Sequence, residues 1–155
     1  MGAGASVGVS VAISDITTVV KALVDSAVIR TRAGSQGVTV SASDTAAITA
    51  VAVGGAVSVQ AGSAGVAIAV GTSVAVNKVF NTVHAQIQGG RIETGGAALT
   101  VSATQQADIT SVVLGASVAV SVGDSANAAI GGGGALARNV ISASVQAVVS
   151  DAVID

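Results

Sequence analysis

Three acidic residues are the first candidates for chemistry in this chain of 155 residues: Glu93, Asp108 and Asp124. Parallel β-helix enzymes that cleave polysaccharides need two or more carboxyl groups on one face, which act as acid and as base or nucleophile. The three carboxylates are isolated in the sequence, so stacking of separate rungs would be needed to bring them together. We interpret them as solubilising residues of turns and edges and predict no enzymatic activity. A carbohydrate-active β-helix enzyme is the alternative.

Asp124 and Asn127, in the segment GDSAN, are the candidate metal ligands. Calcium prefers carboxylate and carbonyl oxygens, and one class of repeat protein binds it through the pattern GGxGxDxUx. The glycine runs Gly95–Gly96 and Gly131–Gly134 lack the aspartate of that pattern. We favour a role for Asp124 and Asn127 in the turn itself, because Asx residues stabilise turns. We therefore predict no cofactor, with calcium as the alternative.

His84 is the only histidine, and the chain has no cysteine, which excludes disulfides and thiolate metal sites. No GxxxxGK[ST] motif occurs, nor a GxGxxG that follows a strand and opens a helix. Gly131–Gly134 instead aligns with Ala69–Thr72, inside an apolar strand, where we expect close approach of a neighbouring layer. The net charge of −2 leaves no basic stripe, so no nucleic-acid partner is predicted.

The residues around these candidates recur at a fixed period. Ser63–Ile92 returns in looser form from Ser125, about 62 positions later, and VTVSAS at Val38–Ser43 returns as LTVSAT at Leu99–Thr104. Such a period is typical of stacked repeats. We predict one repeat array over residues 1–155, with copies at about 2–62, 63–124 and, in part, 125–155. Because the chain begins and ends within a copy, we expect adjacent repeats of a longer parent chain to be its partners.

Few polar residues keep their identity between copies. Glu93 has an acidic match only in Asp155, and the first copy has Arg30 at that position. Asn77 and Asn139 do recur, and matching asparagines in a solenoid form a hydrogen-bonded ladder along the stack. We therefore interpret Asn77 and Asn139 as structural residues.

The apolar residues follow the period of a strand. In Ala50–Val59, Gly65–Val76 and Ser111–Val122, β-branched residues alternate with Ala, Gly or Ser. The small-residue face carries no charge, so we expect both faces of these strands to be covered. Short polar clusters near Gly62 and Asp124 separate pairs of apolar runs, which predicts hairpins.

The segment Thr82–Thr104 consists of short alternating stretches separated by glycine pairs. This pattern is typical of parallel β-solenoid rungs of about four to six residues, which stack Val, Ile or Leu inward. Residues 13–24 and 76–87 also satisfy helical spacing, but the third copy breaks it, so we favour strand and leave a short helix open. The predicted fold class is all-β: a parallel β-helix-like solenoid with long Ala/Val-rich hairpins stacked into thin sheets.

The composition supports a folded chain built from small residues. It is 51% hydrophobic, 9% charged and 1% aromatic, which is unlike a disordered protein. No charge occurs from Thr45 to Asn77, a length that can cross a bilayer. The polar turn Gln60–Gly65 and the alternation argue against a membrane helix. A membrane-embedded Ala/Gly-rich protein is an alternative, as is a self-assembling filament subunit.

The segment Ala85–Thr104, which reads AxIxGGxIxTGGxxLTVSAT, resembles repeats of very large secreted bacterial surface proteins. These are filamentous-haemagglutinin-like and leukotoxin-like filamentous adhesins and autotransporter passenger stalks; the degenerate copy Ala27–Ser43 fits the same frame. The resemblance implies an extracellular or cell-surface solenoid stalk that holds other modules away from the cell. It carries over no functional residue and no receptor. We also expect end-to-end self-association, because an excised array exposes unpaired strands.

Overall fold

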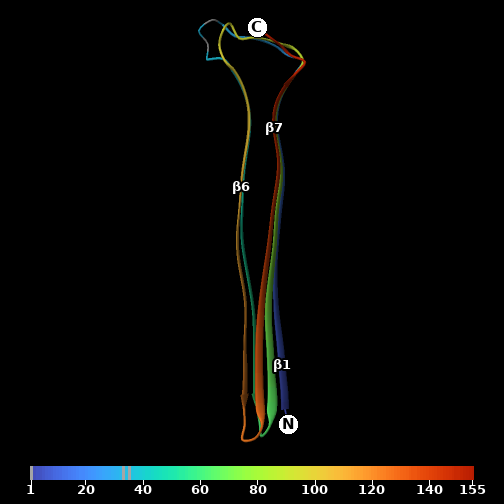
Figure 1. Ribbon diagram of the computed structural model, residues 1–155, viewed down its shortest axis with the longest axis vertical. Coiled ribbons are helices and arrows are strands. Elements are labelled where there is room, and N and C mark those ends of the chain that lie inside the picture. Colours follow the sequence, from blue (N-terminus) through green and yellow to red (C-terminus); the bar gives the residue numbers. More distant parts are fainter. Residues whose placement is uncertain (1, 33, 35) are drawn as a thin grey trace. The chain divides into compact units, whose positions relative to one another are not determined.

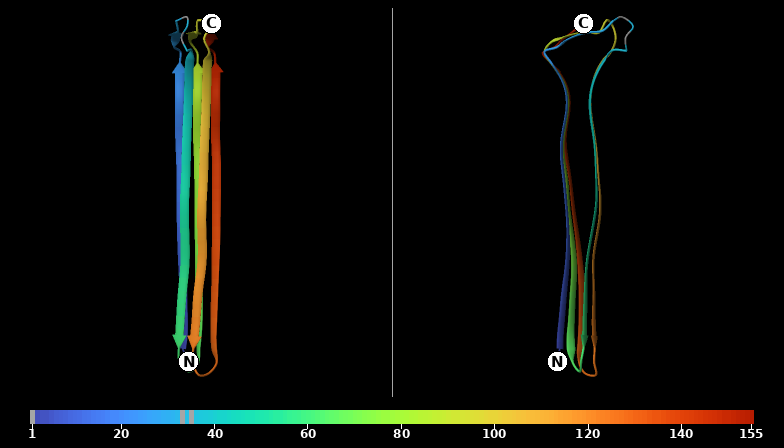
Figure 2. Two further views of the ribbon diagram at one scale, coloured as in Figure 1. Left: turned by 90° about the vertical axis from the view of Figure 1, so that its left-hand side faces the viewer. Right: turned by 180° about the vertical axis from the view of Figure 1, so that it is seen from behind.

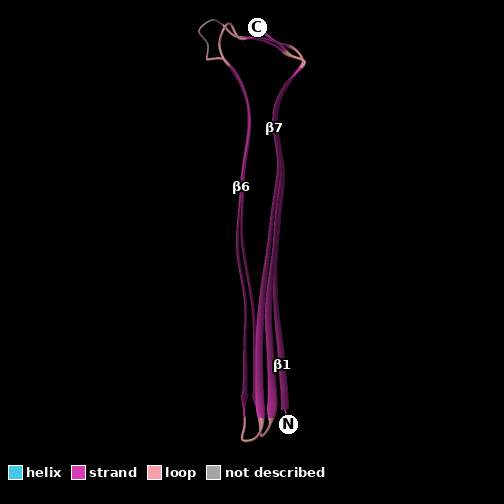
Figure 3. Ribbon diagram, viewed as in Figure 1, coloured by secondary structure: helices cyan, strands magenta, loops and turns pink. Residues whose placement is uncertain are grey.

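The computed structural model describes residues 2–32, 34 and 36–155; Met1, Ala33 and Ser35 lie outside this part, the last two within the degenerate copy. The described residues form strands and turns without a helix (Figure 3). Residues 13–24 and 76–87, for which a helix was left open, therefore belong to strands. The strands are β1 (Gly2–Asp25), β2 (Val28–Arg30), β3 (Val38–Ala61), β4 (Gly65–Gln88), β5 (Arg91–Glu93), β6 (Leu99–Val122), β7 (Asn127–Ser150) and β8 (Val153–Ile154).

Equivalent strands of successive copies stack into three sheets. Their orders are β1-β4-β7, β3-β6 and β2-β5-β8. The strands within each sheet run parallel, and Figure 2 shows the arrowheads of β1, β4 and β7 pointing opposite to those of β3 and β6. In the short sheet the register pairs Ile29 with Ile92 and Ile92 with Ile154. Each copy of the repeat thus forms one coil, and the predicted all-β, parallel solenoid fold is confirmed.

The number of short rungs differs from the prediction. In Thr82–Thr104 only Arg91–Glu93 is a separate short strand, and the flanking residues are the ends of two 24-residue strands, β4 and β6. Alternation continues without interruption through Val83 and Ile87, both fully buried. Nothing therefore ends β4 before the corner at Gly89, where φ is +65°.

The predicted hairpins are arches in the structure. β3 and β4 are consecutive along the chain, but they lie in different sheets and form no ladder with each other. At the turn the backbone hydrogen bond runs to another coil instead, from Gly62 N to Val122 O at 3.0 Å. The stacking of copies gives each long strand its neighbours within a sheet, so β3 and β4 are not joined by a backbone hydrogen-bond ladder. Figure 1 shows β1 and β7 on one side of this arch and β6 on the other.

The chain forms two compact units, each of which takes one segment from every copy. Unit 1 contains Met1–Ser14, Ile48–Asn77 and Ile109–Val140. Unit 2 contains Asp15–Ala47, Lys78–Asp108 and Ile141–Asp155. The two units bury opposite kinds of side chain, although the same long strands contribute to both.

Unit 2 has the usual polarity of a protein core. Val79, Val83, Ile87 and Ile92 are fully buried, and Val40 is nearly so. The outward positions of the same strand segments carry polar residues such as Lys78, His84 and Gln86. Removal of these apolar side chains from water is the main source of stability that this unit can draw on.

Unit 1 has the reverse polarity. Ala67 and Ala69 on β4 are fully buried, whereas Ile68 between them points outward and is 40% exposed. On β3, Ala52 is buried, whereas Val51 is 61% exposed. The expectation that both faces of these strands are covered is therefore not met: the small-residue face is covered, and the β-branched face is open.

A set of inward glycines in unit 1 explains this arrangement. Each of the five long strands carries one of them, and a Cβ atom added at any of them would collide with the backbone of the opposite sheet. These residues are Gly8, Gly54, Gly71, Gly115 and Gly133. The two sheets therefore touch backbone to backbone, and any residue larger than glycine would force them apart. The close approach expected for the run Gly131–Gly134 holds at Gly133, while Gly132 faces open space.

We expect Gly71→Ala to destabilise the protein by about 2 kcal/mol or more, because its methyl group would overlap the Ala116 carbonyl. Gly132→Ala is the matched control, since nothing lies within 4 Å of its added carbon, and it should stay within about 0.5 kcal/mol of the wild type. Urea denaturation followed by circular dichroism measures both. Equal unfolding midpoints for the two variants would contradict the close sheet contact.

Candidate functional site

The two recurring asparagines are in direct contact. Asn77 on β4 is fully buried, and its Nδ2 donates a hydrogen bond to Asn139 Oδ1 on β7 at 2.9 Å. The Oδ1 atom of Asn77 has no hydrogen-bond partner among the described residues. The second and third copies are thus joined by a buried side-chain amide pair within unit 1, as in the ladders that asparagines form in stacked strands.

Serine hydroxyls add polar contacts between the two sheets of unit 1. Ser117 Oγ donates to Gly132 O at 2.7 Å, Ser121 Oγ to Gly65 O at 3.0 Å, and Ser73 Oγ to Leu114 O. A carbonyl oxygen has two lone pairs, so it can accept from a serine as well as from the ladder. The sequence analysis did not single out these serines. Their positions on the small-residue face were the available signal.

A chain of ion pairs connects all three copies at one edge of unit 2. Glu93 accepts from Arg30 Nε at 2.9 Å and from Arg91 Nε at 2.8 Å, and Arg91 also pairs with Asp155. The hydrogen bond from Arg91 is the largest cause that lowers the pKa of Glu93 below its ordinary 4.5, and the nearby charge of Arg30 adds to it. The bond to Glu93 and the charge of Asp155 raise the pKa of Arg91. Glu93 is thereby held as a carboxylate, which is unsuited to the role of proton donor.

The candidate metal ligands lie at the turn between β6 and β7. Asn127 Nδ2 donates to the carbonyl oxygens of Gly123 and Ser125 at 3.0 and 2.8 Å, and Asn127 Oδ1 lies 3.4 Å from Ser121 Oγ. The side-chain amide of Asn127 therefore closes the turn, and Asp124 lies in the same turn. Across the described residues, no group of three or more His, Asp or Glu side chains is arranged to hold a metal ion.

Unit 2 also buries a polar contact that the sequence analysis missed. Asn81 Nδ2 on β4 donates to the carboxylate of Asp44 on β3, and Asn81 is only 3% exposed. Two buried polar atoms of this unit, Asn81 Oδ1 and Gln105 Nε2, have no hydrogen-bond partner among the described residues. His84 lies on an outward position of β4, as Lys21 does on β1.

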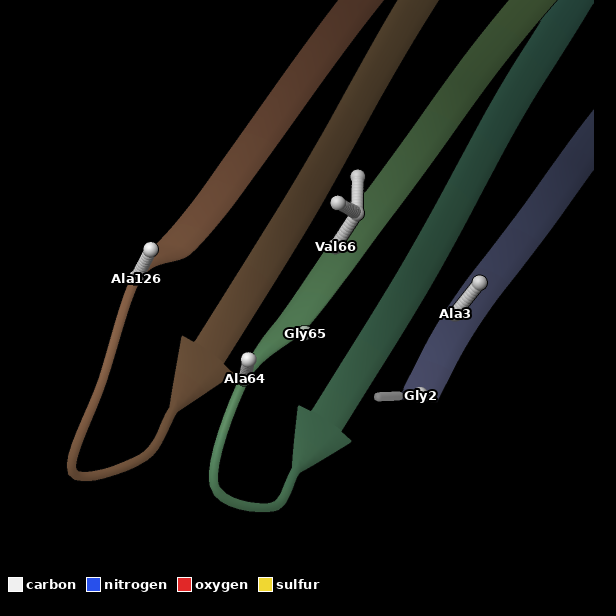
Figure 4. Close-up of a pocket in the computed structure, with 6 residues that line it drawn as sticks. All are labelled: Gly2, Ala3, Ala64, Gly65, Val66 and Ala126. Carbon is white, nitrogen blue, oxygen red and sulfur yellow. The ribbon is translucent and has the colours of Figure 1, made fainter.

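A hollow in unit 1 offers no reactive group. It has a volume of about 360 Å³ and lies beside the turns, where β1, β4 and the start of β7 meet (Figure 4). Its lining is made of small apolar residues and backbone, namely Gly2, Ala3, Ala64, Gly65, Val66 and Ala126. This surface can contact apolar groups but cannot perform acid–base or nucleophilic chemistry.

No protein-family model, curated protein or solved structure matches this chain. Within the described part, no helix is both long enough and apolar enough to cross a membrane.

The hydrogen bond between Asn77 and Asn139 should contribute to the stability of the protein. Asn139→Val removes the acceptor and leaves the buried Asn77 amide unpaired, which should cost about 1 kcal/mol. The double variant Asn77→Val, Asn139→Val removes donor and acceptor together, so its unfolding midpoint should lie above that of the single variant. A double variant that is less stable by the sum of both single effects would argue against a coupled pair.

The lowered pKa of Glu93 predicts a dependence of stability on pH. Its contribution is complete above the ordinary value of 4.5 and is lost as the pH falls through the lower folded-state value. Glu93→Gln should therefore be less stable than the wild type at pH 7, and the two should converge in strong acid. Denaturant titrations from pH 7 to pH 2 measure this, and about 1 M salt should shrink the difference at pH 7. A constant difference between the two proteins over the whole range would refute the ion-pair role.

Proposed function

We propose that this chain is a rigid structural spacer, part of a solenoid stalk in a large surface or secreted bacterial adhesin. The observation that carries the proposal is the single coil per repeat, in which each copy presents the same strands to the next. Such an interface can be extended by further copies without any change of design. The extracellular location comes from the resemblance of Ala85–Thr104 to adhesin repeats.

The contacts between coils fit a load-bearing role. Parallel ladders run the length of 24-residue strands, the pairs Ile29–Ile92 and Ile92–Ile154 stack in the short sheet, and ion pairs and asparagines bridge the same coils. Because each coil contacts only its neighbours, stability should grow by similar steps as coils are added. To separate two coils, all of these contacts must break together rather than one at a time.

The polar groups support a non-catalytic role. Glu93 is engaged by two arginines, and Asn127 by the carbonyls of its own turn. Asp124 and Asp108 lie in different units. Glu93 and Asn127 thus make structural contacts, and Asp108 and Asp124 belong to different units. No observation favours the alternative of a carbohydrate-active enzyme.

The spacer role can be tested with tandem arrays of Ser63–Asp124, which contains β4, β5 and β6 of one coil. Each added copy should lengthen the particle by about 4.8 Å, the spacing of neighbouring strands, at constant cross-section. Negative-stain electron microscopy of arrays of increasing copy number measures this. A particle length that does not increase linearly with the number of copies would contradict the proposal. Thermal unfolding with calcium or a chelator serves as a control, since a shift would point instead to a calcium site at Asp124 and Asn127.

A further inference from the structure

The outer faces of unit 1 are the feature that the spacer role leaves unexplained. By outer faces we mean the outward side chains of β1, β3, β4 and β6 within that unit. Both sheets expose large apolar residues there: Val7 and Ile13 are 73% and 74% exposed, and Val53 and Leu114 are 59% and 56% exposed. Exposed apolar surface on this scale marks a site of interaction.

Charge is nearly absent from the same unit. Of the fourteen charged residues of the chain, only Asp124 and Arg138 belong to unit 1. Asp124 lies in the turn beyond the end of β6, and β1, β3 and β4 contribute no charge to this unit. Arg138 lies on β7, outside the outer faces as defined above. The defined faces carry no charge and therefore provide no electrostatic complementarity to a soluble protein partner.

The length of the apolar stretch matches the interior of a membrane. On β4 the outward apolar residues extend from Val66 to Val76, and on β6 from Val112 to Val122. Ten steps along a strand cover about 33 Å, close to the hydrocarbon core of about 30 Å. The next outward residue along β4 is Lys78, so the apolar stretch ends at a charge.

Three serines of unit 1 are directed inward. Ser73, Ser117 and Ser121 donate across the gap between the sheets, and Thr72 is the one polar residue among the outward positions of β4 from Val66 to Val76. In hydrocarbon every backbone group must be paired. The inner strand β4 meets this requirement through β1 and β7, and the outer strands would meet it once further coils or second copies continue the sheets.

We propose that unit 1 inserts into a lipid bilayer, as an array of stacked arches with both outer faces in contact with the hydrocarbon. Lipid is favoured over a second copy packed face to face because the two outer faces are equally apolar. One copy would cover only one of them, whereas lipid surrounds both. The inference goes beyond the spacer role and does not depend on it.

Flotation with phosphatidylcholine vesicles tests the insertion. The wild type should float with the vesicles. Ile68→Lys and Val53→Lys place a charge on the two outer faces of unit 1, and each should reduce the bound fraction at least about tenfold. Thr82→Lys and Thr45→Lys, at outward positions of unit 2 on the same strands, are the matched controls and should float like the wild type. Circular dichroism verifies that each variant is folded.

A second measurement does not depend on how the charged variants fold. Because the chain has no cysteine, a polarity-sensitive fluorophore can be attached at Val70→Cys in unit 1 or at Thr82→Cys in unit 2. Vesicles should shift the emission to the blue only at Val70→Cys. A wild type that fails to float, or equal shifts at both sites, would overturn the proposal. So would vesicle-independent assemblies that Ile68→Lys dissolves, since the face would then join copies of the chain. None of these results alters the expected length per copy of the tandem arrays.

Discussion

The contact between two sheets at backbone distance is the constraint on which unit 1 depends. Paired sheets usually stand about 10 Å apart, because side chains fill the space between them. Here Gly8, Gly54, Gly71 and Gly115 stand where any side chain would strike the opposite backbone. The other buried positions of β4 in this unit carry small or polar residues, such as Ala67, Ser73 and Asn77. At these glycines the core of the unit is therefore too thin to accommodate valine or isoleucine. The buried Ile48 of this unit lies six residues before Gly54 along β3.

The polarity of the unit follows from that limit. A strand has only two faces, so residues that do not fit the thin core must point outward. Val and Ile supply the β propensity of the strands, and they are left exposed to whatever surrounds the unit. In unit 2 the large apolar residues Val83 and Ile87 point inward, and Lys78, His84 and Gln86 stand at outward positions beside the exposed Phe80. One strand pattern thus serves two kinds of surface.

Contacts between coils are as repetitive as the coils themselves. The corner after β1, β4 and β7 takes a positive φ in all three copies, at Ser26, Gly89 and Asp151, although only one of them is glycine. The position that carries Arg30 in the first copy carries Glu93 in the second, and these two form an ion pair. Asp155 at the same position of the third copy pairs with Arg91 instead. A repeat can therefore preserve an interaction between copies while every residue in it changes.

Periodicity in the sequence was sufficient to determine the repeat, the strands, the turns near Gly62 and Asp124, and the recurrence of Asn77 and Asn139, because these follow from local spacing. It did not determine which face of a strand is buried. Alternation of Val with Ala is the same whether the large or the small residues point inward, and only the distance between the sheets decides. Nor did it show that consecutive strands form arches, or that serines donate across the sheets, since these depend on contacts between residues of different strands. The tertiary structure alone decided those points.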